Sequence, residues 1–322
     1  MQGVHGASEM FVESFVDLYR AGILKREVNG VLLHAAFFVG SKAFYQALRE
    51  MPEFERAKFQ MTAVSYVNEL YGDETAKRSA RIKGRFINNA MMATLLGAVI
   101  SDGLEDGKVV SGVGGQYNFV AQSFALADAR SIIMMRATRN TKGRVASNIL
   151  WNYGHTTIPR HLRDVVVTEY GIADLRGKTD RDTIAAMLGI ADSRFQSELL
   201  KQAKDSGKIE IDFELPAACQ QNTPERIETA LRPAYVAGLL PPFPFGTDFT
   251  QIEQRLIPAL RRLSSASSIQ LFGLLIRGLG SRARFVGTHD CLDRMGLARP
   301  RGLVELIYAA LLRGCLQSSR VA

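Results

Sequence analysis

Two glutamates are the first candidates for chemistry in this chain of 322 residues. Glu9 lies in the stretch GASEMFV (residues 6–12), and Glu169 lies in VVVTEYG. A carboxylate can attack an activated carbonyl carbon as a nucleophile, or it can be a hydrogen-bonded structural acid. The spacing of the two residues leaves both roles open for each of them.

The glycine-rich segment SGVGGQ, residues 111–116, is the next candidate because it joins a predicted strand to a predicted helix. Backbone N–H groups and a helix N-terminus can converge on an anion at such a loop. A dinucleotide-binding fingerprint would need glycine where Tyr117 stands, and the Gly-Lys-Ser/Thr of a phosphate loop is absent. The pair Gly114 and Gly115 therefore indicates either a tight turn or a close approach of backbone to a ligand carbonyl.

Histidine and cysteine spacing does not predict a metal site. His155 and His161 lie six residues apart in GHTTIPRHLRD, without a cysteine or acidic pair at ligand spacing. No G-x-S-x-G elbow accompanies them, so packing or hydrogen-bonding histidines are the favoured interpretation. Three widely separated cysteines indicate neither a disulfide framework nor a zinc site: Cys219, Cys291 and Cys315.

The elements that must position these residues alternate between helical and strand patterns. EMFVESFVDLYRAG predicts a helix with Ser8 as N-cap, which would put Glu9 in a first turn that favours an anion by roughly 0.3–1 kcal/mol. Strand patterns and helical patterns then follow each other along the chain, which is typical of an α/β protein. Strands are predicted within 31–40, 59–68, 108–110, 130–139 and 163–175, and helices within 41–51, 116–129 and 183–207.

Composition indicates a folded, water-soluble protein, with 47% hydrophobic and 22% charged residues. No stretch reaches the roughly 18 apolar residues that span a bilayer, and the first residues lack the pattern of a secretory signal. We therefore expect a cytoplasmic protein that has no membrane as a partner.

The net charge of +8 is concentrated in the tail, where ten arginines face only three acids from Leu260 onward. An arginine-rich helical surface is favoured over nucleic-acid binding, because no aromatic residues are interleaved for stacking on bases. After PFPFGTDFT (residues 242–250) the strand patterns end and the remainder reads as helical, with SSASS as a break. We predict a catalytic-type domain over 1–220 and a mostly helical extension over 221–322.

Residues 84–120 and 154–178, and above all VVVTEYGIADLRG, closely resemble the C-terminal domain of the acetyl-CoA hydrolase/transferase family. The likeness runs from about Ser8 to about Gly207. It implies an open three-layer α/β/α fold of the NagB/RpiA/CoA-transferase-like class. In that family the active site lies between two similar domains.

The resemblance also implies roles for individual residues. Ser8-Glu9-Met10 matches the segment whose glutamate attacks the thioester carbonyl, whereas Glu169 matches a structural position. Gly114 and Gly115 correspond to a glycine pair whose N–H groups face the acyl oxygen. Asn88, in FINNAM, matches an asparagine beside the reacting groups, and Gln116 belongs with them at the acyl-CoA site.

The implied reaction is CoA transfer or acyl-CoA hydrolysis through a glutamyl anhydride and a glutamyl-CoA thioester at Glu9. Its substrates are an acyl-CoA such as acetyl-CoA and a small carboxylate or water, with coenzyme A as part of the substrate and no permanently bound cofactor. The family's first domain is absent from this sequence, so we expect a separate N-terminal domain or a homo-oligomer as partner. The alternative is a non-catalytic half that binds a partner.

Overall fold

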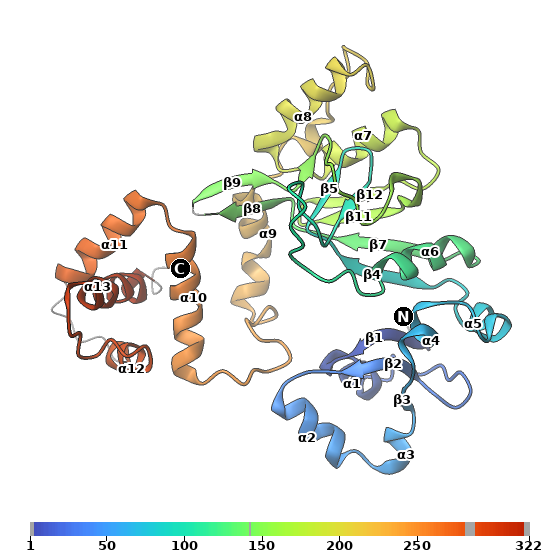
Figure 1. The fold of residues 1–322 in the computed structure, drawn as a ribbon, viewed down its shortest axis with the longest axis horizontal. Helices are drawn as coiled ribbons and strands as arrows, with labels where there is room; N and C mark the ends of the chain where they lie inside the picture. Colours follow the sequence, from blue (N-terminus) through green and yellow to red (C-terminus); the bar gives the residue numbers. More distant parts are fainter. Residues whose placement is uncertain (1–2, 142, 281–286, 319–322) are drawn as a thin grey trace. The chain divides into compact units, whose positions relative to one another are not determined.

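The computed structural model describes residues 3–141, 143–280 and 287–318. Contacts divide the chain into two units, one of Met1–Thr138 with Ser147–Gly246 and the other of Arg139–Ala146 with Thr247–Ala322. Figure 1 shows the elements of both units, coloured along the sequence. Residues 221–246 thus group with the first unit, whereas the sequence prediction began the extension at 221.

The first unit begins with a three-stranded parallel sheet in the order β1-β2-β3 (Figure 1). Phe11 of its first strand packs with Leu33 of the second and with Phe44 of a covering helix, and all three are buried. Ser41 caps that helix by accepting a hydrogen bond from the Phe44 backbone N–H. The elements of this part are β1 Gly6–Phe11, α1 Glu13–Arg20, β2 Leu33–Phe38, α2 Lys42–Glu50, α3 Glu53–Arg56, β3 Phe59–Met61, α4 Val64–Asn68 and α5 Glu74–Ala80.

The predicted helical position of Glu9 is wrong, because Glu9 lies inside strand β1 and the helix begins only at Glu13. Residues of β1 pair in parallel register with β2, from Gly6 opposite Leu33 onward. The Ser8 hydroxyl donates to the Met10 carbonyl oxygen at 2.9 Å and does not cap a helix. Pairing with a strand more than twenty residues away satisfies this backbone, and it overrides the local helical pattern.

A four-stranded sheet in the order β12-β11-β7-β4 forms the middle of the first unit. Helix α6 contacts β4 and β7, whereas α7 contacts β12 and shares a buried cluster with β11. A second, small sheet has the order β10-β5-β6. The elements are β4 Arg85–Asn89, β5 Met92–Thr94, β6 Val99–Ile100, α6 Gln116–Ala125, β7 Arg130–Met134, β10 Ile149–Leu150, η1 Arg160–Leu162, β11 Val165–Thr168, β12 Gly171–Asp174, α7 Asp180–Gly189, α8 Ser193–Asp205, η2 Ala217–Cys219 and α9 Pro224–Val236.

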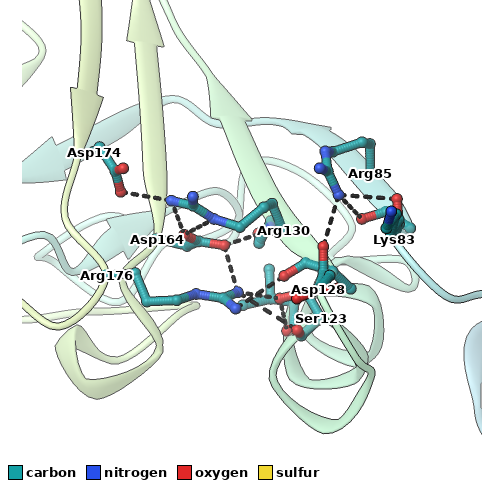
Figure 2. Close-up of polar contacts among 12 residues, drawn as sticks. Lys83, Arg85, Ser123, Asp128, Arg130, Asp164, Asp174 and Arg176 are labelled. Atoms are coloured by element: carbon teal, nitrogen blue, oxygen red, sulfur yellow. Dashed lines mark hydrogen bonds and ion pairs between the residues drawn. The ribbon is translucent and has the colours of Figure 1, made fainter.

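One buried carboxylate ties this sheet to its surroundings (Figure 2). The Asp164 side chain is 1% exposed and lies between the guanidinium groups of Arg130 and Arg176, at 2.7 and 2.5 Å. It also accepts the backbone N–H of Ser131 at 2.6 Å. Arg130 reaches Asp174 as well, at 2.5 Å. Two cations and a backbone donor therefore compensate the burial of this charge.

The structure confirms an α/β fold and corrects three element boundaries. Residues 108–110 form no strand, and only an isolated bridge joins Val109 to Gly103. The predicted strand over 59–68 ends at Met61, and α4 follows. The helix predicted over 183–207 is two helices, because Asp192 caps the start of α8 with its side chain.

In its described residues, the second unit consists of a hairpin and a group of helices. Helices α11 and α13 pack so closely that a Cβ atom at Gly278 would collide with the Ala310 carbonyl oxygen. Cys291 and Cys315 are buried here, and the Cys315 thiol donates to the Ala259 carbonyl oxygen at 3.3 Å. Arg282, Arg284 and Arg320 of the predicted basic tail lie outside the described residues. The elements are β8 Thr138–Thr141, β9 Arg144–Ser147, α10 Gln251–Ser265, α11 Ser268–Gly280, α12 Thr288–Arg294 and α13 Leu303–Ser318.

Across the described ranges, no helix combines the length and the apolar character needed to cross a membrane.

Candidate active site

The Glu9 carboxylate meets the glycine loop that precedes α6. Its Oε2 atom accepts a hydrogen bond from the Gly115 backbone N–H at 3.1 Å. Its Oε1 atom accepts a second hydrogen bond from the Asn68 side-chain amide at 3.0 Å. The structure therefore brings together Glu9 and the glycine pair that sequence analysis named, although 106 positions separate Glu9 from Gly115.

Each glycine of the loop allows a different close approach. Gly114 has a φ angle of +57°, and a Cβ atom there would also lie 3.0 Å from Oε2 of Glu9. A Cβ atom at Gly115 would lie 2.6 Å from Cγ of Asn68. Any larger residue at Gly114 would strain the backbone, and any larger residue at Gly115 would displace the amide that holds Glu9.

A helix N-terminus does act on Glu9, but it belongs to another helix than the one predicted. Gly115 is the N-cap residue of α6, which is ten residues long. The Gly115 N–H is thus one of the donors at that helix start that have no acceptor inside the helix, and the helix dipole there favours a negative charge. The predicted contribution of a helix starting at Glu9 is therefore wrong, and the helix start beside Glu9 is that of α6.

Asn68 is the site residue that sequence analysis missed. It ends α4, is 9% exposed, and its carbonyl oxygen accepts a hydrogen bond from the Gln122 side chain of α6. Arg81 in turn donates to Gln122 Oε1 at 2.5 Å and to the Val67 carbonyl oxygen at 3.1 Å, and burial lowers the pKa of its guanidinium group. The stretch YVNEL carries no motif that could have singled out this asparagine.

Three buried polar atoms around the loop have no hydrogen-bond partner among the described residues: Asn68 Oδ1, Asn88 Nδ2 and Gln116 Oε1. The other end of the Gln116 amide donates to the Asn89 carbonyl oxygen at 2.7 Å, which ties the start of α6 to the end of β4. Within the described ranges no hydrogen bond joins Asn88 to Glu9. Buried polar atoms are nearly always paired in proteins, so a polar ligand is a natural partner for these groups.

The remaining candidates from the sequence, Glu169, His155 and His161, are not among the residues that donate hydrogen bonds to Glu9. Glu169 Oε2 accepts the Ala137 backbone N–H at 2.9 Å, a structural contact. His155 Nε2 lies 3.1 Å from Asp102 Oδ1, and His161 is exposed.

A CoA-transferase-type α/β domain is the class that this fold and carboxylate site resemble. The model of the acetyl-CoA hydrolase/transferase C-terminal domain matches residues 40–203, and the chain belongs to this family. The matched range contains Asn88, Gly114, Gly115 and Gln116, whereas Glu9 precedes it.

Individual relatives agree with this assignment. Butyryl-CoA:acetate CoA-transferase from Anaerostipes caccae is 31% identical over 63% of this chain and 44% of its own length. 4-Hydroxybutyrate coenzyme A transferase from Clostridium kluyveri is 30% identical over 63% of this chain and 45% of its own length. The crystal structure of RipA from Yersinia pestis matches 64% of this chain and 44% of its own, with 27% identity and a TM-score of 0.53. The fold is thus CoA-transferase-like, and the chain spans less than half the length of these relatives.

Proposed function

We propose that this chain carries the nucleophilic half of a CoA-transferase active site, with Glu9 as the nucleophile. The observation that carries the proposal is the pairing of Glu9. Each carboxylate oxygen accepts one hydrogen bond from a neutral donor, Asn68 or Gly115, and no ion pair involves Glu9 in the described part of the chain. Such a carboxylate is oriented without being neutralised by a cation, as a nucleophile requires.

The proposed reaction starts when a Glu9 oxygen attacks the carbonyl carbon of an acyl-CoA. The carbon–sulfur bond breaks, CoA leaves as the thiolate, and a mixed anhydride of Glu9 and the acyl group remains. The thiolate then attacks Cδ of Glu9 and releases the acyl group as a carboxylate. A second carboxylate then attacks Cδ of this glutamyl-CoA thioester, which gives a new mixed anhydride and releases the CoA thiolate again. The thiolate attacks the acyl carbon of that anhydride, so that the new acyl-CoA leaves and the Glu9 carboxylate is restored.

The two donors suit the second step in particular. When the thiolate attacks Cδ, negative charge develops on a Glu9 oxygen, and these are the atoms that accept from Gly115 and Asn68. A fixed donor at a developing oxyanion contributes about 3–4 kcal/mol to the stability of the transition state. Gly115 would act through its backbone N–H, Gly114 through its lack of a side chain, and Asn88 and Gln116 through their unpaired amide atoms toward the acyl-CoA.

A carboxylate acceptor is favoured over water by the relatives, whose names describe CoA transfer between acids. Water attacking the glutamyl thioester would instead give hydrolysis of acetyl-CoA. We propose coenzyme A as a substrate and no permanently bound cofactor.

We also propose that a further domain or a second chain covers the edge of the site. Met10, Phe37, Phe38 and Val39 are each between 39% and 49% exposed at the carboxyl ends of β1 and β2. A cluster of exposed apolar side chains beside a reactive group is typical of an interface, and closing it would exclude water from the thioester.

Chemical trapping at Glu9 tests the proposal. The protein, expressed in its native host so that any partner is retained, is incubated with acetyl-CoA and treated with borohydride, which reduces a glutamyl thioester. Mass spectrometry should find the reduced residue at Glu9, and the Glu9→Gln variant should lack it. Glu53→Gln, which changes an exposed glutamate, is the matched control and should label normally. Absence of label, or label at another glutamate, would refute the assignment of Glu9.

A further inference from the structure

The stretch SDGLEDG, residues 101–107, meets the segment that carries His155 and Thr157. Asp102 of SDGLEDG accepts a hydrogen bond from the Thr157 hydroxyl at 2.5 Å and lies 3.1 Å from His155 Nε2. Thr157 in turn accepts the Ser101 backbone N–H at 2.9 Å. These hydrogen bonds, first that from Thr157 and then that from His155, lower the pKa of Asp102 below its ordinary value. Asp102 therefore joins the two segments as an anion across 53 and 55 positions.

The segment that carries Thr157 is anchored in the core. The Thr157 and Ile158 backbone N–H groups both donate to the Val99 carbonyl oxygen, at 2.8 and 3.0 Å. Ile158 is 1% exposed and packs with Val99 and with Val120 of α6. Thr157 is thus a firm point of attachment for the side chain of Asp102.

The main chain of Asp102 holds the segment that leads into the glycine turn. Its carbonyl oxygen accepts the backbone N–H of Val110 at 2.8 Å and of Ser111 at 3.3 Å. Residues 103–109 form a closed loop between these points, with a bridge from Gly103 to Val109. Ser111 is followed directly by Gly112, Val113, Gly114 and Gly115, so the point at which the chain enters the turn is fixed from Asp102.

Gly103 is part of the same arrangement. A Cβ atom there would lie 2.7 Å from Nε2 of His155. The absence of a side chain lets the imidazole ring lie against the loop and reach the Asp102 carboxylate.

We propose that Asp102 is a positioning residue for the Gly115 backbone N–H, acting through Ser111, and that Thr157 and His155 fix Asp102 in turn. The inference rests on the proposed function, since Gly115 matters as a donor to Glu9. A displacement of about 1 Å in a catalytic group can cost on the order of 100-fold in rate. Loss of the Asp102 side chain should therefore lower kcat more than it changes KM.

The variants are Asp102→Ala, Asp102→Asn and Thr157→Val, with Asp106→Ala as the matched control in the same loop. Asp106 is exposed, and its side chain accepts a hydrogen bond from the nearby Lys108 N–H. Asp102→Ala should lower kcat for acyl-CoA transfer by about 10- to 100-fold with KM within about 2-fold. Asp102→Asn keeps an acceptor for Thr157 and should restore part of that loss.

Hydrogen exchange supplies a readout that does not depend on activity. The amides of Ser111 and Gly115 should exchange at least about 10-fold faster in Asp102→Ala and in Thr157→Val than in the wild type. Their exchange rates in Asp106→Ala should equal those of the wild type. Thr157→Val retains the charge of Asp102 and serves if the alanine variant does not fold. Unchanged exchange at both amides, with a kcat equal to that of the control, would overturn the proposal. An inactive wild type with faster exchange in the variants would instead support the positioning and reject the proposed function.

Discussion

Two carboxylates of the first unit, Glu9 and Asp164, show how the same chemical group is used in opposite ways. Asp164 is 1% exposed at its side chain and is held by two guanidinium groups and a backbone N–H (Figure 2). Glu9 is partly buried, and among the described residues it accepts hydrogen bonds only from the Asn68 amide and the Gly115 N–H. Neither of its donors carries a charge.

The difference lies in what each environment stabilises. Two cations beside Asp164 hold its negative charge in place, so the group contributes to stability and is a poor nucleophile. Neutral donors at Glu9 orient the oxygens and leave their electrons available for attack on a carbonyl carbon. The kind of donor, more than the degree of burial, separates the structural acid from the proposed reactive one.

Removing the charge of Asp164 should have the largest effect on stability. Asp164→Asn leaves Arg130 and Arg176 without their anion and should lower the free energy of unfolding by about 3–5 kcal/mol. Asp174→Asn is the matched control, because its carboxylate is 56% exposed and pairs with the same Arg130. The control should cost no more than about 1 kcal/mol in urea unfolding. Equal losses in both variants would contradict the structural role of Asp164.

A methyl group at Gly115 should affect activity at Glu9 more than stability, which is the opposite of the effect expected at Asp164. Gly115→Ala would push the Asn68 amide away from Glu9 and should lower kcat by about 10- to 100-fold, with a smaller effect on unfolding than Asp164→Asn. Gly112→Ala is the control, since a Cβ atom there meets nothing within 4 Å. Steady-state kinetics on both variants measure the difference. A fully active Gly115→Ala variant would show that the hydrogen bonds to Glu9 are dispensable.

Acid should destabilise the fold through His5, which directly precedes the strand that carries Glu9. Burial, followed by the charges of His34 and Arg26, lowers the pKa of His5 to about 4 from its usual 6.5. Between pH 6.5 and about 4, His5 is therefore protonated in the unfolded chain but neutral in the folded chain. The contribution of neutral His5 to the free energy of unfolding is complete above pH 6.5 and is lost as the pH falls toward 4. We expect a loss on the order of 1–2 kcal/mol, reduced in His5→Gln and unchanged in His161→Gln. Urea unfolding between pH 7.5 and 4.5 measures it, and an identical slope in His5→Gln would reject it.

Local patterns predicted much of the fold correctly. The helix predicted over 41–51 is present as α2, and the glycines before QYNFVAQSF precede α6. The predicted strands at 31–40 and 130–139 are present as β2 and β7. These signals are caps, turn residues and periodicity. They can be recognised in the sequence because each depends on residues only a few positions apart.

The placement of Glu9 could not be predicted in the same way. Residues 9–22 do have helical spacing, and only the parallel register with β2 makes the first of them a strand. Asn68 reaches Glu9 because α4 ends at that residue and Gln122 of α6 holds its backbone. Neither the pairing of β1 with β2 nor the contact of Asn68 with Glu9 can be predicted from the residues next to them in the sequence.

By itself, the sequence determined the alternation of strands and helices, the glycine turn ahead of α6 and the membership of the family. The tertiary structure alone decided that Glu9 lies on a strand, that Gly115 and Asn68 are its donors, and that Asp102 meets Thr157 and His155. Turns, caps and periodic patterns depend on neighbours along the chain. A site assembled from positions 9, 68 and 115 depends on how distant strands pair and how helices pack on them, and this packing is settled only when the whole domain folds.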